Sequence, residues 1–406
     1  MEYQQMLDLV PEDLQDVSTF QTSGCKPLGK LSIGFGLAQQ IGDEALQFGT
    51  GKVLMVTDKT IVDLRLHEVV VRSLETSGFE VSLFSDVEQE PHLDTARNVQ
   101  RRVRADNFSL IVGLGGGSAM DMAKVAFLTG TNPGDIKEYM TGTPVRHEGL
   151  PCILLPTTSG TGSEVSPFIV LSEEDTKLFV SLPYLYTTVA LVDPLLSVTM
   201  PPQVTAATGL DALSHAMDGL IGKPGPLTEA LSFKAVELIF QYLERACTDG
   251  MDFRARYGMS FASVLGMMAY TQGGGLYAHS CSYVLTIKNK TPHGTGCGVT
   301  LPYTLLFNFE FVKGLLARIS RIIEPGFQGT EDELAFQTIM NFRKLLGRVG
   351  MPTTIKELGI SKDFLPEFAE ALVEKYYRAK NPRPMSLEEA RRFVEAMWHG
   401  QCEKID

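Results

Sequence analysis

The chain has 406 residues, more than a single hydrophobic core usually supports, so its length predicts two domains. Hydrophobic residues make up 44% of the chain and charged residues 21%, which is typical of globular proteins. A net charge of −12 without a basic cluster argues against nucleic-acid binding. The acidic N-terminus has no apolar signal core, no apolar run reaches membrane length, and the six cysteines are scattered. We therefore expect a cytoplasmic protein that acts on small molecules and binds neither membranes nor nucleic acid.

The first half of the chain alternates short apolar segments with helical patterns, which predicts a mostly parallel sheet. Helices are expected at LHEVVVRSLETSG (66–78) and TARNVQRRVRADN (95–107). Strands are expected at KVLMVTD (52–58), FEVSLFSD (79–86), FSLIVGLGGGS (108–118), CILLPTTSGTGSE (152–164) and VALVDP (189–194).

The pattern changes near Met200, after which consecutive helical segments follow one another. We expect an α/β domain over residues 1–198 and an all-helical domain over residues 199–406. The expected helices include residues 204–221, 227–246, 255–272, 310–323 and 386–398.

Gly115, Gly116 and Gly117 lie between an expected buried strand and a helix that starts near Ser118. Glycines let the backbone approach a ligand closely, and a helix N-terminus offers unpaired N–H groups, so the segment predicts a pyrophosphate site. The segment differs from the GxGxxG fingerprint, and a tight turn that needs glycine for steric reasons is the alternative.

Two further polar features follow expected strands. Asp58 comes directly after a strand, where a carboxylate can bind a ribose diol and would repel a 2′-phosphate, which favours NAD over NADP. Thr157, Thr158, Thr161 and Ser163 offer hydroxyls on a glycine-containing loop. The alternatives are a helix N-cap for the aspartate and a solvated turn for the loop.

Asp211 and His215 are four residues apart, so they lie on one face of an expected helix and can bind one metal ion. His279 is expected to end a helical, glycine-rich segment, and His293 is expected in a loop between Pro292 and Gly294. All four fall in the helical domain at places able to converge. A hydrogen-bonded Asp–His pair and two loop histidines remain the alternative.

One carboxylate and three imidazoles suit Fe(II) or Zn(II). Four protein ligands would close a tetrahedral zinc site, whereas Fe(II) accepts a fifth ligand, so Fe(II) is expected and Zn(II) is the alternative. Cys281 and Cys297 could compete as ligands but show no paired spacing, and are interpreted as core or loop thiols. His67, His92, His147 and His399 are interpreted as surface residues.

The chain resembles the iron-containing (group III) alcohol dehydrogenase family from Lys30 to the C-terminus. The resemblance rests on VTD, GGGSAMDMAK, PTTSGTGSEVS, VALVDP, TGLDALSHAMD and PHG, in that order. It implies an N-terminal Rossmann-like NAD-binding α/β domain, a C-terminal helical metal-binding domain and a homo-oligomer, a dimer or larger. It implies metal ligation by Asp211, His215, His279 and His293. The cofactor contacts that it implies are Asp58, Gly115, Gly116, Gly117, Ser118, Asp121, Thr157, Thr158, Thr161, Val170 and Lys177.

Two positions depart from the family pattern. Many members have a histidine four residues after the third ligand, where this chain has Tyr283, so tyrosine becomes the candidate for relaying the alcohol proton. Asp218 stands where the family usually has glutamate, and we expect it to support a ligand rather than to bind the metal.

The resemblance implies an NAD(H)-dependent alcohol dehydrogenase or aldehyde reductase that transfers hydride between a small primary alcohol and its aldehyde. The metal would act as a Lewis acid on the substrate oxygen. One alternative is an anionic short aldehyde bearing a carboxylate, sulfonate or phosphonate, paired with Lys288 or Lys290, although a solvated loop also explains these lysines. A dehydroquinate-synthase-like lyase that uses NAD transiently and a non-catalytic binding protein are the others.

Overall fold

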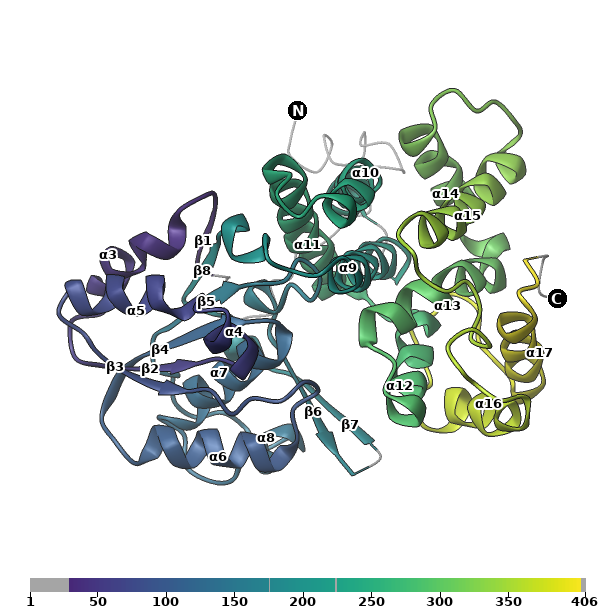
Figure 1. Cartoon of the computed structure of the whole chain (residues 1–406). Helices are drawn as coiled ribbons and strands as arrows, with labels where there is room; N and C mark the ends of the chain where they lie inside the picture. Colours follow the sequence, from purple (N-terminus) through teal and green to yellow (C-terminus); the bar gives the residue numbers. More distant parts are fainter. Residues whose placement is uncertain (1–28, 175, 223–224, 403–406) are drawn as a thin grey trace, which may run out of the picture.

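The computed structural model describes residues 29–174, 176–222 and 225–402; the acidic N-terminal segment lies outside them. The described chain forms an α/β half and a helical half, with α9 (Pro202–Gly222) lying between them (Figure 1). The strands are β1 (Lys30–Ile33), β2 (Lys52–Val56), β3 (Glu80–Phe84), β4 (Phe108–Gly115), β5 (Cys152–Pro156), β6 (Phe168–Glu173), β7 (Thr176–Ser181) and β8 (Val189–Val192). The helices of the α/β half are α3 (Ile41–Leu46), α4 (Lys59–Asp63), α5 (His67–Thr76), α6 (Leu93–Arg104), α7 (Gly117–Thr129) and α8 (Ile136–Met140).

The main sheet has the strand order β1-β8-β5-β4-β2-β3, and every pairing in it is parallel. This confirms the predicted fold class. The central strands β4 and β5 are almost wholly buried, because parallel strands covered by helices on both faces need continuous apolar runs.

The chain reverses direction across the sheet between β2 and β4. It runs outward from β2 to β3, then returns to β4 on the other side of β2 and continues outward to β5. Ligands of open α/β sheets bind at the carboxyl ends of the strands beside such a switch point. Gly115 is the last residue of β4, and Asp58 comes two residues after the end of β2.

A two-stranded antiparallel sheet, β6 with β7, was not predicted from the sequence. It extends from the α/β half on the side of the helical half (Figure 1). The aromatic ring of Phe168 in β6 meets Tyr270 of the helical half edge-on, with 5.8 Å between the ring centroids.

From Pro202 onward, all the regular secondary structure in the described part of the chain is helical. The expected boundary at residue 198 falls between β8 and α9 and stays a prediction. The remaining helices are α10 (Pro226–Thr248), α11 (Phe253–Gly273), α12 (Tyr277–Asn289), α13 (His293–Phe307), α14 (Phe309–Ile323), α15 (Glu331–Arg348), α16 (Leu365–Glu374) and α17 (Leu387–His399).

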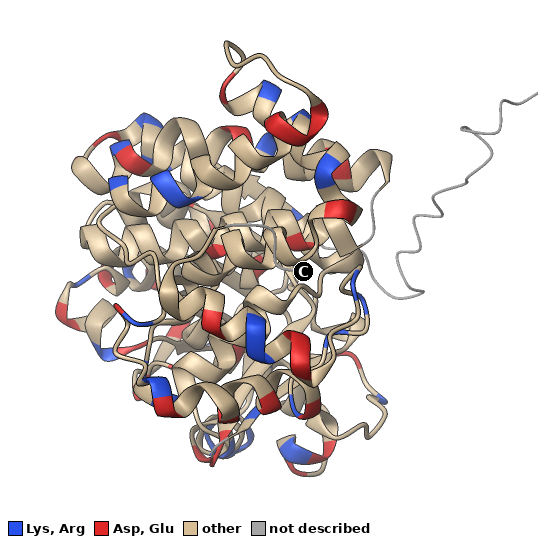
Figure 2. Cartoon of the chain, turned by 90° about the vertical axis from the view of Figure 1, so that its right-hand side faces the viewer, with Lys and Arg blue, Asp and Glu red and all other residues tan. Residues whose placement is uncertain are grey.

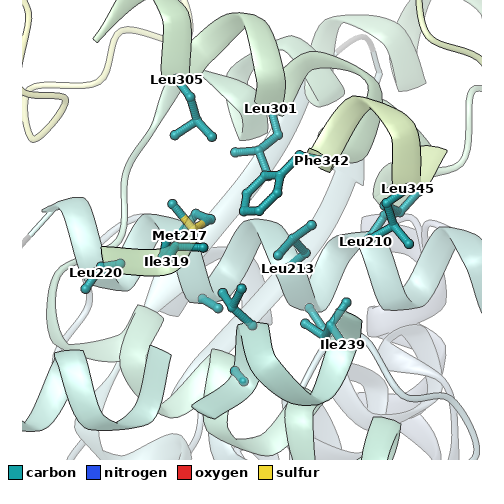
Figure 3. Close-up of a cluster of buried hydrophobic side chains, with 14 of the residues drawn as sticks. Leu210, Leu213, Met217, Leu220, Ile239, Leu301, Leu305, Ile319, Phe342 and Leu345 are labelled. Carbon is teal, nitrogen blue, oxygen red and sulfur yellow. The ribbon is translucent and has the colours of Figure 1, made fainter. Parts of the chain in front are cut away.

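The core of the helical half forms around one side of α9 (Figure 3). Leu210, Leu213, Met217 and Leu220 follow helical spacing and pack against residues of α10, α13, α14 and α15. These four side chains are at most 1% exposed, so α9 is fixed in position by apolar burial.

Acidic and basic residues are interspersed on the face of the helical half drawn in Figure 2. No helix in the described part of the chain combines the length and apolarity needed to cross a membrane.

Candidate metal and cofactor site

The polar residues of α9 occupy a different side of the helix from its core leucines. Asp211, His215 and Asp218 follow one another at spacings of four and three residues, so they share one face. All three are buried, Asp218 completely. A buried carboxylate or imidazole is costly without partners, so this polar stripe indicates a site.

The other two histidines lie in helices, and the expectation that they lie at a helix end and in a loop is wrong. α11 ends at Gly273, Gly275 has a φ of +151° that favours glycine, and α12 begins at Tyr277, so His279 lies in the first turn of α12. His293 is the first residue of α13, after Pro292, which fits the preference of proline for helix starts.

The three predicted histidine ligands lie around Asp211, although the donor atoms that are all within 4.8 Å of one another belong to Asp211, His279, His293 and Cys297, without His215. Asp211 Oδ1 lies 3.9 Å from His215 Nε2, 4.0 Å from His279 Nε2 and 3.7 Å from His293 Nε2. Neither Asp211 Oδ1 nor His279 Nε2 has a hydrogen-bond partner among the described residues, although both are buried. Unpaired N and O donors that face one another fit a divalent cation.

A protein oxygen lies within 3.3 Å of the second nitrogen of each imidazole. Nδ1 of His215 lies 3.3 Å from the carbonyl oxygen of Gly160, and Nδ1 of His279 lies 3.1 Å from Asp218 Oδ2. Ser282 Oγ lies 2.9 Å from Nδ1 of His293 and donates to the carbonyl oxygen of the same residue. These contacts leave the three Nε2 lone pairs free for a metal ion.

Asp218 is anchored by its surroundings. Its Oδ2 accepts hydrogen bonds from the backbone N–H groups of Gly275 and Leu276, at the turn that leads into α12. Burial alone would raise the pKa of Asp218, but His279 and these hydrogen bonds outweigh burial and lower it. The carboxylate is therefore ionised and orients His279.

The protonation states follow from burial and neighbours. Burial lowers the pKa of His215 to about 4, so this ring is neutral at pH 7. Burial also disfavours charge on His293, but Cys297 and Asp211 outweigh it and raise the pKa of His293 to about 10. Burial would raise the pKa of the Cys297 thiol, whereas His279 and His293 lower it to about 7. A metal ion that binds here must displace protons.

Cys297 lies among the ligand atoms. It follows His293 by one turn of α13 and is fully buried, and its Sγ lies 3.6 Å from His293 Nε2. Ligand atoms of Asp211, His279, His293 and Cys297 all lie within 4.8 Å of one another. Its expected role as a core or loop thiol does not account for this position.

The predicted cofactor residues gather at the carboxyl ends of β2, β4 and β5. Asp58 follows β2 and caps α4, its Oδ1 accepting the N–H of Ile61 at 3.1 Å. Gly115 has a φ of +150°, and a Cβ there would lie 3.2 Å from the second carboxylate oxygen of Asp58. Gly116 caps α7, and a Cβ at Gly117 would lie 2.9 Å from the Thr161 side chain. These glycines are therefore needed for close packing against Asp58 and Thr161, the alternative that the sequence left open, and they bring both side chains beside the N-terminus of α7, whose N–H groups can bind a phosphate.

The remaining predicted cofactor residues make internal contacts. The Asp121 carboxylate accepts hydrogen bonds from Ser163 Oγ at 2.6 Å and from the N–H of Val170 at 2.9 Å. It therefore links α7 to β6 and to the loop between β5 and β6 (residues 157–167), called the threonine loop below. Lys177 Nζ pairs with Glu90. Ser118 Oγ accepts from the N–H of Glu90, and the N–H of Thr157 donates to the carbonyl oxygen of Gly115. Thr158 lies beside Gly116.

Two tyrosine rings contact the histidines, and a third tyrosine lies beside one of them. Tyr270, which was not predicted, lies 5.0 Å from His215 and 5.4 Å from His279 between ring centroids, and burial raises its pKa to about 12. Tyr283, the predicted relay residue, stacks on His293 at 5.5 Å. Tyr376 lies 5.6 Å from Tyr283.

Arg378, also not predicted, lies beside these rings. Its guanidinium carbon is 5.5 Å from the Tyr283 ring centroid, and its Nε donates to Ser280 Oγ at 2.9 Å. Burial would lower the pKa of Arg378, but Tyr283, Tyr270 and Asp218 outweigh it and raise the pKa. A permanent positive charge therefore lies at the edge of the histidine cluster.

The lysines proposed to pair with an anionic substrate do not lie in a loop between the ligands. α12 continues to Asn289, so Lys288 is helical and exposed, with its Nζ 3.9 Å from the Phe364 ring centroid. Lys290 is the exposed left-handed C-cap of the helix, with φ +61°.

Most of the chain matches two known protein families. Residues 29–194 match the family described as iron-containing alcohol dehydrogenase, and residues 205–398 match the C-terminal family of Fe-containing alcohol dehydrogenases. The chain belongs to the iron-containing alcohol dehydrogenase family. It is an NAD-dependent oxidoreductase that interconverts alcohols and aldehydes and uses a metal ion. These matches favour this activity over the lyase alternative.

Individual relatives cover nearly the whole chain. Long-chain-alcohol dehydrogenase 1 of Geobacillus thermodenitrificans (strain NG80-2) is 34% identical over 374 residues, 91% of this chain and 95% of the relative. Sulfoacetaldehyde reductase of Bilophila wadsworthia (strain 3_1_6) is 30% identical and covers 90% of this chain and 97% of its own. A crystal structure of a 1,3-propanediol oxidoreductase superposes with a TM-score of 0.86 at 28% identity, covering 92% and 100% of the two chains.

Proposed function

We propose that this enzyme interconverts a short primary alcohol and its aldehyde at a divalent metal ion held by Asp211, His215, His279 and His293. The observation that carries the proposal is that three Nε2 atoms lie 3.7–4.0 Å from Asp211 Oδ1, while a protein oxygen faces each Nδ1. The bound ion supplies Lewis-acid stabilisation of the substrate oxygen. Fe(II) is the proposed ion, with Zn(II) as the alternative.

The chain's own residues then place and protect the reactants. Asp58 and the glycines Gly115 to Gly117 hold NAD(H) at the switch point of the sheet. Tyr270 and Tyr283 cover the histidines and limit access of water. Tyr283, whose hydroxyl can donate and accept, passes the alcohol proton toward solvent. A homo-oligomer and a cytoplasmic location complete the proposal.

The decisive experiment measures NADH oxidation with short aldehydes after the protein has been stripped of metal and reloaded anaerobically with Fe(II) or Zn(II). We expect no turnover in stripped protein, restoration by one of the ions, and no restoration in Asp211→Asn. Exposed His147 serves as the control position, and His147→Ala should behave as wild type. Full turnover of Asp211→Asn would contradict the proposal.

Arg378 favours a second candidate, an aldehyde that carries an anionic group. The guanidinium lies next to Tyr283, which stacks on His293, so an anion a few bonds from the carbonyl would reach it. Sulfoacetaldehyde, named in one relative, is such a molecule. Lys288 lies over Phe364, which makes Arg378 the better anchor.

Matched substrates test this candidate. A charged hydrogen bond contributes about 1.5–3 kcal/mol, so Arg378→Gln should raise KM for sulfoacetaldehyde about 10- to 100-fold while changing KM for propanal much less. Lys288→Gln should leave both unchanged. Equal effects of Arg378→Gln on the two aldehydes would exclude anion recognition by Arg378. Choline, an alcohol that carries a positive charge, should be a poor substrate of the wild type.

A further inference from the structure

We infer that Cys297 is itself a ligand of the metal ion, an addition to the donor set that rests on the proposed metal site. Two observations point to it independently. The sulfur lies 3.6 Å from His293 Nε2. The sulfur and ligand atoms of Asp211, His279 and His293 all lie within 4.8 Å of one another. In addition, Asp211 Oδ1 and His279 Nε2 are buried and unpartnered within the described chain, so the thiol faces open ligand positions rather than satisfied ones.

The spacing of the donors suits coordination. Metal–nitrogen bonds of about 2.0–2.1 Å and metal–sulfur bonds of about 2.3 Å in a tetrahedron separate ligand atoms by about 3.3–3.6 Å. The Cys297–His293 distance of 3.6 Å lies in this range, and the Asp211 distances of 3.7 Å to His293 and 4.0 Å to His279 need only small adjustments.

The position of Cys297 on its helix follows from the ligand before it. His293 and Cys297 are residues i and i+4 of α13, so they lie one above the other on the same face, as Asp211 and His215 do on α9. A thiol that only filled space in the core would not need this register.

His215 and Cys297 compete for the coordination position beside Asp211, His279 and His293. These three residues belong to the predicted ligand set, which His215 completes, and to the group of mutually close donors, which Cys297 completes. A thiolate is a softer donor than an imidazole and favours Zn(II) over Fe(II). Cys297 therefore shifts the ion preference of the site toward Zn(II), and each of the two donors can partly compensate for loss of the other.

Co(II) provides the test because its spectrum reports thiolate ligation without turnover. We expect the Co(II)-loaded protein to show visible ligand-field bands and a near-ultraviolet sulfur-to-Co(II) charge-transfer band. Cys297→Ser should lose the charge-transfer band but keep the visible bands. Cys281→Ser removes a second buried thiol of the same region and should keep both. Circular dichroism verifies that each variant is folded.

Metal affinity separates the two donors. His215→Ala should still bind Co(II) and keep the charge-transfer band. Cys297→Ser should lower the ratio of the Zn(II) affinity to the Fe(II) affinity at least tenfold. The variant with both substitutions should lose more metal affinity than the two single variants combined. Visible bands without a charge-transfer band in the wild type would overturn the role of Cys297 and leave the metal site intact. Failure of the wild type to bind Co(II) at all would overturn both.

Discussion

The histidine ligands depend on the oxygen atoms behind them. Asp218 lies 3.1 Å from His279 Nδ1, is held by two backbone N–H groups and is completely buried. Removing its charge leaves the ring free to rotate and makes Nε2 a weaker donor.

We predict that Asp218→Asn weakens metal binding by about 10- to 100-fold, the usual effect of losing such a partner, without unfolding the protein. Competition with a chromophoric chelator measures the affinity. Asp363→Asn, at an exposed aspartate, is the control and should bind metal as the wild type does. Unchanged affinity in Asp218→Asn would mean that His279 is oriented by other contacts.

At the level of single residues, the sequence predicted those whose partners lie nearby in the chain. Asp211 and His215 were recognisable from a spacing of four residues on a helix. His279 and His293 needed the family resemblance to join them. Tyr270 and Arg378 were not predicted, because they reach the site through packing between separate helices and loops: Tyr270 of α11 lies beside His215 of α9, and Arg378 contacts Ser280, 98 residues away.

At the level of elements, the threonine loop between β5 and β6 joins the two halves. Gly162 has a φ of +57°, and a Cβ there would lie 2.3 Å from Met267 Cβ on α11. The same loop provides the Gly160 carbonyl oxygen that faces His215. Close packing of this loop on the helical half therefore positions His215, a proposed metal ligand.

We predict that Gly162→Ala lowers the free energy of unfolding. The left-handed backbone costs alanine about 1 kcal/mol, and overpacking of its methyl group against Met267 costs roughly a further 1–3 kcal/mol. Gly359→Ala is the matched control, because Gly359 has a φ of +87° but open space around its Cβ position among the described residues. Denaturant unfolding should show the larger loss in Gly162→Ala. Equal losses would mean that the loop moves freely away from α11.

Glu164, in the 3-10 turn Ser163–Val165 of this loop, gives stability a pH dependence. Burial raises its pKa from 4.5 to about 7 in the folded protein. Between these values the unfolded chain has lost this proton and the folded chain keeps it, so stability falls as pH rises from about 4.5 to about 7 and then stays lower. The loss is about 3 kcal/mol.

We therefore predict that Glu164→Gln, which cannot ionise, is more stable than the wild type at pH 8, with a difference that shrinks toward pH 5. Urea unfolding at both pH values measures it. Glu367→Gln, at an exposed glutamate, should show no such trend. A pH-independent difference would indicate that the gain comes from packing rather than from ionisation.

Among the elements, the central parallel strands could be predicted because a strand buried on both faces needs a continuous apolar run. The parallel edge strand β1, which is only partly buried, was not predicted. The β6–β7 hairpin escaped prediction: its exposed and buried positions are mixed, and its place depends on contacts such as Phe168 with Tyr270. The break between α11 and α12 was also missed, although the three consecutive glycines Gly273 to Gly275 lie at it. The segment TQGGGLYA is predicted as helical, whereas the positive φ of Gly275 redirects the chain.

At the level of the whole molecule, α9 serves the core and the site together. Its leucines pack into the helical core shown in Figure 3, while its polar face carries Asp211 and His215. The other proposed ligands come from α12 and α13, so an ion bound as proposed would link three helices whose positions are otherwise set by apolar packing. Metal binding should therefore add to global stability without creating the fold.

We predict that removing the metal lowers the free energy of unfolding but leaves the far-ultraviolet circular dichroism unchanged. With free metal at 100 times its Kd, binding to the folded state alone contributes about 2.7 kcal/mol. Denaturant unfolding with graded metal, or with a chelator, measures this linkage. Asp211→Asn should unfold at the same denaturant concentration with and without metal, because a central donor is lost. If metal stabilises Asp211→Asn as strongly as the wild type, the ion binds elsewhere and the three helices are not joined at this point.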